Sequence, residues 1–225
     1  MGALHRRFES RMYWHVKRPI LDRVLRPTYD GPVDTYRFWR IPRGRLDASS
    51  VCFCAGVGEE IELERGLRRD TDAIVYALDP TPRAIAFIDR LGIDDDRFRF
   101  VPVGLWNEDT TLRFHAPHNP ADVSHSIVTQ QDSGSHFDAP CRTVRSLMTE
   151  YGLDRLDLLK MNIEGAEEAI LKSIVADDIR PGMIAVTFEG ERPFRRALQW
   201  TKYFASRGYR HCGFSSWSMT YVREP

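Results

Sequence analysis

The 225-residue chain lacks three features that would each assign it to a class of protein. Lys plus Arg and Asp plus Glu both number 32, so no overall field favours nucleic acid. No apolar run reaches the roughly 18 residues of a membrane-spanning helix, and the first residues show no apolar signal-peptide core. We therefore expect a cytoplasmic protein that binds a small molecule, not nucleic acid or a membrane; the oligomeric state is left open.

Cysteine is scarce, with four residues and no Cys-x-x-Cys spacing, which argues against a disulfide framework. Cys52 and Cys54 lie in an apolar run, and we expect reduced, buried thiols there. Four histidines could be considered as metal ligands, but their spacing matches no common zinc pattern: His115, His118, His125 and His136. The sequence therefore predicts no metal site.

What the chain does contain is a strand, turn, helix and strand pattern between Val51 and Asp79. Its first five residues are apolar and end at Gly56, which is typical of a strand buried on both faces of a parallel sheet. Gly56 and Gly58 permit a sharp turn and the close approach of a ligand. Asp79 ends the next apolar run, at the distance where an acid can accept two hydrogen bonds from a ribose diol. The pattern predicts an adenosine site.

The same segment distinguishes between adenosine cofactors. A dinucleotide fingerprint needs a third glycine where this chain has Ile61, because the helix must pack closely while its N-H groups receive a diphosphate. We expect Glu59 and Glu60 in the first turn of that helix, where two carboxylates would repel a diphosphate. S-adenosylmethionine has no phosphate and carries two positive groups. The residues therefore favour a methyl donor over NAD.

The rest of the chain alternates between predicted strands and helices. Further strands are expected at 35–41, 99–104, 111–115, 156–161, 183–188, 209–214 and 217–222. This alternation predicts one α/β domain with a doubly wound, mostly parallel, Rossmann-like sheet of seven strands and an antiparallel C-terminal strand. We assign an N-terminal helical extension and a strand to 1–49, the catalytic core to 50–225, and a candidate substrate lid to the polar loop 116–139.

Three motifs resemble those of the FkbM-type family of S-adenosylmethionine-dependent methyltransferases: residues 53–59, residues 77–82 and above all Leu158–Ala166. The last is similar to the family's Lys-x-Asp-x-Glu-Gly signature, with Asn162 where the family has Asp. The resemblance extends over about residues 50 to 190. It implies a class I methyltransferase sheet and methyl transfer to a hydroxyl, typically of a sugar, a polyketide or a related natural product.

Candidate site residues follow from the predicted strand ends and from this resemblance. The cofactor-binding candidates are Ala55, Gly56, Gly58, Glu59, Asp79, Pro80, Gly104, Leu105 and Asn162. The candidates for catalysis are Asn162, Glu164, Glu189 and His125. Asn162 cannot act as a base, but its amide can position a cofactor ammonium or a substrate hydroxyl. The alternative is a non-catalytic S-adenosylmethionine-binding or partner protein whose chemistry was lost at Asn162.

Overall fold

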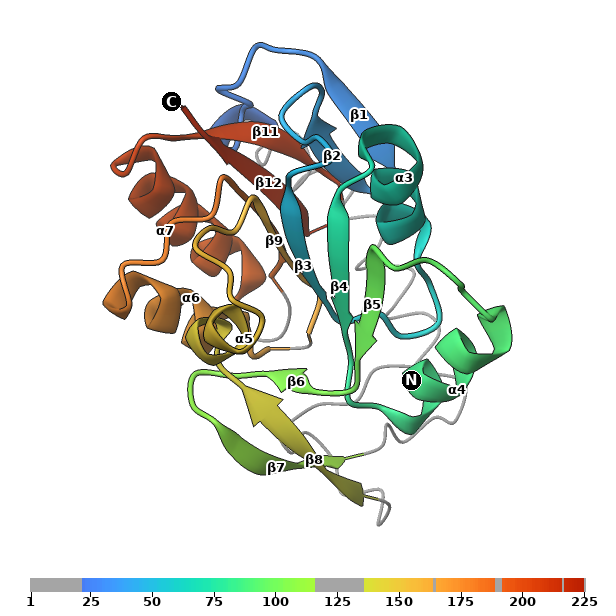
Figure 1. The fold of residues 1–225 in the computed structure, drawn as a ribbon. Coiled ribbons are helices and arrows are strands. Elements are labelled where there is room, and N and C mark those ends of the chain that lie inside the picture. Colours follow the sequence, from blue (N-terminus) through green and yellow to red (C-terminus); the bar gives the residue numbers. More distant parts are fainter. Residues whose placement is uncertain (1–21, 116–135, 164, 189–191, 216, 225) are drawn as a thin grey trace, which may run out of the picture.

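The structure is a computed structural model that describes residues 22–115, 136–163, 165–188, 192–215 and 217–224. Its centre is a seven-stranded sheet (Figure 1). In spatial order the strands are β11 (Tyr209–Ser215), β12 (Ser218–Arg223), β10 (Met183–Thr187), β9 (Leu158–Met161), β3 (Val51–Ala55), β4 (Ile74–Leu78) and β5 (Phe98–Val101). β12 runs antiparallel to the other six strands of this sheet. The predicted mostly parallel sheet with an antiparallel C-terminal strand is confirmed, which is consistent with a Rossmann-like fold.

The strand order changes direction between β3 and β9. From β3 the chain first adds β4 and β5 on one side, and only later β9 and β10 on the other. In open α/β sheets such a switch point leaves a crevice at the carboxyl ends of the two central strands. The glycines after β3 and Asn162 after β9 both lie at this crevice.

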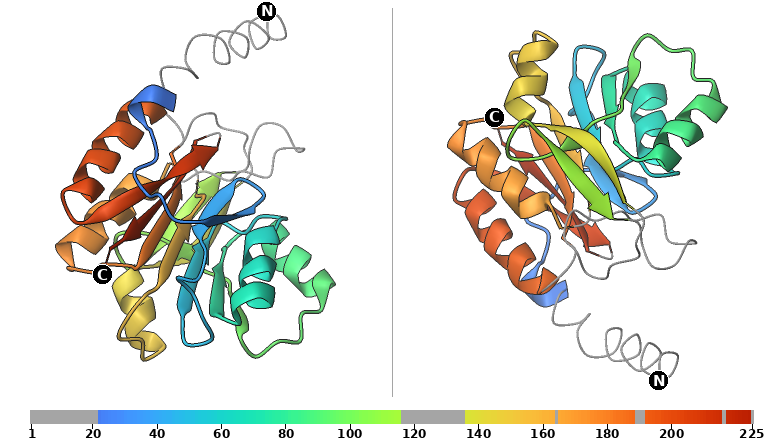
Figure 2. Two further views of the ribbon diagram at one scale, coloured as in Figure 1. Left: turned by 90° about the horizontal axis from the view of Figure 1, so that it is seen from above. Right: turned by 90° about the horizontal axis from the view of Figure 1, so that it is seen from below.

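Two layers of helices enclose the sheet (Figures 1 and 2). Helices α5 (Val144–Glu150), α6 (Glu167–Ala176) and α7 (Pro193–Ala205) pack on one face, and α3 (Glu62–Thr71) and α4 (Pro82–Leu91) on the other. Side chains along β9 alternate between these layers: Leu159 and Met161 join the core under α6 and α7, and Leu158 joins the core under α3. Lys160 therefore emerges on the α3 face.

Residues at the helix ends explain where several helices begin and end. The Thr81 hydroxyl accepts a hydrogen bond from Ala84 N, Pro82 occupies the first turn of α4, and Gly92 ends that helix in a left-handed conformation. Thr143 and Ser146 form a reciprocal capping box at the start of α5.

The predicted strand at 35–41 is wrong: this segment is a hairpin of β1 (Val33–Tyr36) and β2 (Trp39–Pro42). Arg37 and Phe38 form its two-residue turn, and Arg37 has φ +57°, in the left-handed region where glycine is the usual residue. An arginine at this position gives no turn signal. Polar and apolar residues alternate from Thr35 to Ile41 except at the adjacent Phe38 and Trp39, so the pattern predicts one strand.

The predicted strand at 99–104 is also wrong at its end. β5 stops at Val101, and Gly104–Leu105 form β6 of a separate three-stranded sheet with β7 (Thr110–His115) and β8 (His136–Arg142), in the order β6-β8-β7. Pro102 separates the two sheets, and proline has no N-H with which to continue a ladder. Figure 1 shows this second sheet beside the carboxyl ends of the main strands.

The candidate lid at 116–139 also needs a correction, because residues 136–139 belong to β8. The remainder of that loop, 116–135, and residues 1–21 of the predicted N-terminal extension lie outside the described residues. All four cysteines are free and buried, which confirms the expected burial of Cys52 and Cys54. Within the described ranges, no helix is both long enough and apolar enough to cross a bilayer.

Candidate functional site

The turn between β3 and α3 requires glycine at position 56. Gly56 has φ +78°, and a Cβ atom there would collide with the backbone carbonyl of Asn162. Its N-H donates to Leu78 O at 2.9 Å, and Asn162 N donates to Ala55 O at 3.1 Å. The loop therefore packs directly on the chain that follows β9, which brings two of the sequence motifs into contact.

Asp79 fixes the other end of the same loop. The carboxylate is buried; its Oδ2 accepts from Gly58 N at 2.8 Å, and its Oδ1 accepts from Thr81 N at 2.9 Å and Thr81 Oγ1 at 2.6 Å. A carboxylate has about four acceptor sites, so roughly one remains for a ligand. Asp79 can thus accept one ribose hydroxyl while keeping its present bonds, rather than the two that we predicted.

A cavity of about 300 Å³ lies at this end of the sheet, at the lower limit of typical small-molecule sites. All nine residues predicted to bind the cofactor line it: Ala55, Gly56, Gly58, Glu59, Asp79, Pro80, Gly104, Leu105 and Asn162. The structure thus brings together residues from four segments of the chain. Their binding of a cofactor remains a prediction.

Other lining residues were missed in the sequence, notably Arg37, Phe38, Phe114 and Lys160. Arg37 and Phe38 reach the cavity only because the predicted strand is a hairpin with its tip against the glycine loop. Phe114 lies on β7, two strands from β6, and its ring lies close to Gly104 of β6. Lys160 did carry a signal, since it is the first residue of the Lys-x-Asn-x-Glu-Gly motif.

The acids after the glycines differ from the prediction. Helix α3 begins at Glu62, so Glu59 and Glu60 precede its first turn. The Glu59 carboxylate pairs with Arg83 at 2.6 Å, and Glu60 pairs with Arg37 at 2.9 Å. Because arginines balance both charges, simple repulsion of a diphosphate by these two residues is a weak argument.

A different observation disfavours a diphosphate at this helix. Glu60 Oε1 accepts a hydrogen bond from Glu62 N, the first residue of α3, and Glu62 Oε1 accepts from Arg37 N at 2.9 Å. A diphosphate binds to N-H groups that a helix start leaves free. Here the protein's own Glu60 carboxylate already accepts from one of these N-H groups.

A buried ion pair lies behind the loop. Lys160 Nζ is 3.5 Å from Glu64 Oε1, and both side chains are at most 5% exposed. Burial raises the pKa of the Glu64 carboxyl, whereas the nearby Lys160 ammonium lowers it. The same ammonium donates to Gly56 O at 2.8 Å, so the pair is connected directly to the cavity wall.

Of the four predicted catalytic residues, only Asn162 is among the described residues, and it lines the cavity partly exposed. Glu164, Glu189 and His125 lie outside them. Among the residues that the structure describes, no three His, Cys, Asp or Glu side chains cluster as metal ligands.

The sequence matches the family model described as "Methyltransferase FkbM domain" over residues 55–211, more than half of the chain. No curated protein and no solved structure matches it. The matched segment begins at the last residue of β3 and ends within β11. It therefore contains the glycine loop, Asp79 and the motif after β9, the three segments that meet at the cavity. With sequence and geometry in agreement, the chain belongs to the FkbM family of methyltransferases.

Proposed function

We propose that this methyltransferase uses S-adenosylmethionine and transfers its methyl group to a hydroxyl oxygen of a small molecule, such as a sugar or another natural product. The observation that carries the proposal is the arrangement of the glycine loop and the buried Asp79 carboxylate around one cavity at the switch point of the sheet.

The residues present fit this cofactor. Asp79 keeps about one acceptor site for a ribose hydroxyl. Gly104, Leu105 and Phe114 offer an apolar wall on which an adenine can pack. Gly56 lets the loop pack on the Asn162 carbonyl, and at Gly58 nothing lies within 4 Å of the position that a Cβ would take. The Glu60 carboxylate accepts from the first N-H of α3, which suits a ligand without a phosphate.

When bound, the cofactor supplies a methyl carbon that its positively charged sulfur activates. The chain's main task is to hold the acceptor oxygen in line with that carbon, an effect of up to about 7 to 11 kcal/mol. Help from a general base is smaller, typically about 10² to 10⁴-fold. Asn162 cannot take up the proton, so we assign it to orienting the cofactor ammonium or the acceptor hydroxyl. Proton removal falls to Glu164, Glu189 or His125, or to solvent for an acidic acceptor.

The decisive experiment supplies S-adenosylmethionine with a labelled methyl group and a panel of hydroxylated acceptors. Label should appear on oxygen of at least one sugar or polyketide-type acceptor. Transfer to nitrogen or carbon acceptors alone would overturn the assignment to oxygen. Failure of the chain to bind S-adenosylhomocysteine, the demethylated product, would overturn the cofactor assignment itself.

Asn162 supports a second candidate function, in which the chain binds the cofactor without catalysis. The family signature has Asp where this chain has Asn162. If Asn162→Asp gains methyl transfer that the natural chain lacks, the non-catalytic function is correct. If the natural chain already transfers methyl groups, that alternative is excluded.

We also propose a cytoplasmic location and a small acceptor rather than nucleic acid. Four free, buried thiols support a reducing compartment. Equal numbers of acidic and basic residues support the acceptor class, since no net charge attracts a polyanion.

A further inference from the structure

Lys160 joins three segments that are far apart in the sequence. It lies in β9, is 4% exposed, and extends toward the face of the sheet covered by α3 and the β1–β2 hairpin. Its Nζ is 2.8 Å from Gly56 O, 3.5 Å from Glu64 Oε1 and 5.7 Å from the centre of the Trp39 ring. The closest contact is therefore with the glycine loop and not with the carboxylate.

The stability of the fold alone does not explain why Lys160 and Glu64 are buried together. Burying an ammonium and a carboxylate costs several kcal/mol per ion, and replacing such a pair with apolar residues is often neutral or stabilising. At 3.5 Å the Lys160–Glu64 contact is longer than the 2.7 to 2.9 Å of a charge-assisted hydrogen bond, whereas the Gly56 contact at 2.8 Å has that length. The two distances show that the Lys160 ammonium binds the Gly56 carbonyl of the loop more closely than it binds Glu64.

Gly56 needs such a restraint. Its N-H is held by Leu78 O, its Cα lies against the Asn162 carbonyl, and its own carbonyl accepts from Lys160. The peptide that follows leads to Gly58, whose N-H holds Asp79. Glycines on both sides of Val57 impose little steric restriction on the backbone, so a carbonyl without this donor is free to rotate.

We propose that Lys160 is a positioning residue of the methyl-donor site: its ammonium fixes the Gly56 carbonyl and thereby the shape of the loop 55–60. Glu64 supplies the countercharge, and the buried Trp39 ring covers the ammonium. Lys160 acts through the loop and through Asp79, not on the reacting atoms. The inference rests on the proposed function, because it assigns the loop to that cofactor.

The test compares Lys160→Met with the double variant Lys160→Met/Glu64→Gln in the full chain. The readouts are the dissociation constant for S-adenosylhomocysteine by calorimetry and the melting temperature. Lys160→Met leaves a buried carboxylate without a countercharge, so it should lose both stability and affinity. The double variant should recover most of the melting temperature but still bind about 10- to 100-fold more weakly than the natural chain.

Two further variants separate positioning from stability. Glu64→Gln keeps the bond from Lys160 to Gly56, so its affinity should stay within about threefold of the natural chain. Arg68→Met breaks a polar network away from the cavity, so it should lower the melting temperature without weakening binding.

Recovery of affinity together with melting temperature in the double variant would overturn the proposal and reduce Lys160 to a counter-ion. A loss of affinity in Glu64→Gln as large as in Lys160→Met would do the same. If the natural chain does not bind S-adenosylhomocysteine, the proposed function itself fails, and this result differs from both of the others.

Discussion

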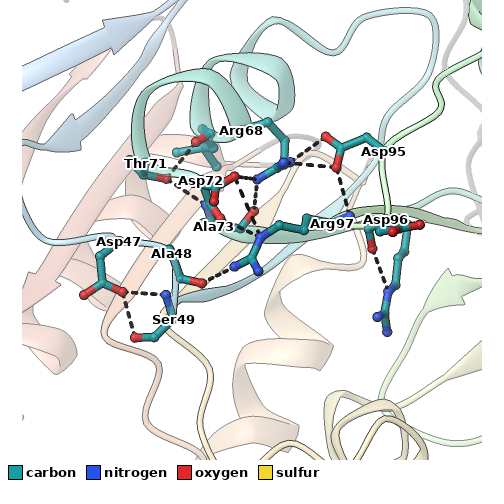
Figure 3. A network of polar contacts seen from close by, with 12 residues as sticks. Asp47, Ala48, Ser49, Arg68, Thr71, Asp72, Ala73, Asp95, Asp96 and Arg97 are labelled. Atoms are coloured by element: carbon teal, nitrogen blue, oxygen red, sulfur yellow. Dashed lines mark hydrogen bonds and ion pairs between the residues drawn. The ribbon is translucent and has the colours of Figure 1, made fainter.

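At the amino ends of β3, β4 and β5 a polar network ties the loops together (Figure 3), whereas at the carboxyl ends the polar groups surround a cavity. In the network, Arg68 donates from Nε and Nη2 to the two oxygens of Asp95, at 2.7 and 3.0 Å, and from Nη1 to Asp72 at 2.8 Å. Arg97 donates to the carbonyls of Asp72 and Ala48. The arginines of this end are committed to protein acceptors.

The carboxyl ends of the strands differ because hydrogen-bond acceptor capacity remains there beside the cavity. Asp79 has about one acceptor site left beside the cavity, and the backbone next to it is glycine. Both ends are rich in charged residues in the sequence, so charge density does not distinguish a site from a structural network. A site is distinguished from a structural network by groups that keep unused hydrogen-bonding capacity beside a cavity.

The largest effect is expected at the carboxyl ends of the strands, beside the cavity. Gly56→Ala places a Cβ against the Asn162 carbonyl at φ +78°, and should weaken S-adenosylhomocysteine binding by about 3 kcal/mol or more. Gly58→Ala is the matched control, because it has φ +56° but open space around the new methyl, and should lose about 1 to 2 kcal/mol. Calorimetry measures both. Equal losses would show that backbone conformation, and not the contact with Asn162, constrains the loop.

The next largest effect is expected in the polar network at the amino ends of the strands. Arg68→Met should lower the free energy of unfolding by about 2 to 3 kcal/mol, since several hydrogen bonds to charged groups are lost together. Urea denaturation measures this loss. Arg113→Met, at an exposed pair with Asp138, should change stability little and serves as the control. Weakened cofactor binding in Arg68→Met would show that the two ends are coupled.

A smaller effect is expected from the ribose candidate. Asp79→Asn keeps the size of the side chain but removes its charge, and should weaken S-adenosylhomocysteine binding by about 1.5 to 3 kcal/mol. Asp94→Asn alters an exposed acid after α4 and should leave the affinity unchanged. Unchanged affinity in Asp79→Asn would remove this carboxylate from the cofactor site.

The smallest effect is an opposite dependence of stability on pH at the two ends. The hydrogen bond from Arg68 holds the pKa of Asp95 below its ordinary 3.8, so its contribution is lost as pH falls through the folded-state pKa. Burial raises the pKa of Glu64 above its ordinary 4.5, so its contribution is lost as pH rises through the folded-state pKa.

Urea denaturation from pH 3 to 8 measures this contrast. Relative to the natural chain, Glu64→Gln should become more stable as pH rises, and Asp95→Asn should become more stable as pH falls. The same direction in both variants would contradict the assignment of opposite shifts.

The parallel strands could be predicted from the sequence because burial on both faces produces continuous apolar runs. The run 51–55 coincides with β3, and 183–188 exceeds β10 by one residue. The start of α3 could not be predicted, because acids in a loop before a helix resemble acids in its first turn. Glu59 and Glu60 show this ambiguity, which only their arginine partners resolve.

The candidate site was predictable where the backbone dictates the residue type, as at Gly56 and Asp79. It was not predictable where tertiary packing decides. Nothing local indicates that Arg37 turns a hairpin against the cavity, or that Lys160 is buried on the face covered by α3. Both depend on contacts between segments more than 20 residues apart.

The wall formed by Gly104, Leu105 and Phe114 belongs to a sheet that shares no ladder with the seven-stranded one. Phe114 is itself supported within that small sheet, by stacking on Phe137 at 5.3 Å. Changes of sequence in β7 and β8 therefore replace no residue of the main-sheet ladders. Directed evolution of the small sheet would therefore alter the wall proposed to pack the adenine, while the main strands that carry the glycine loop and Asp79 stay unchanged.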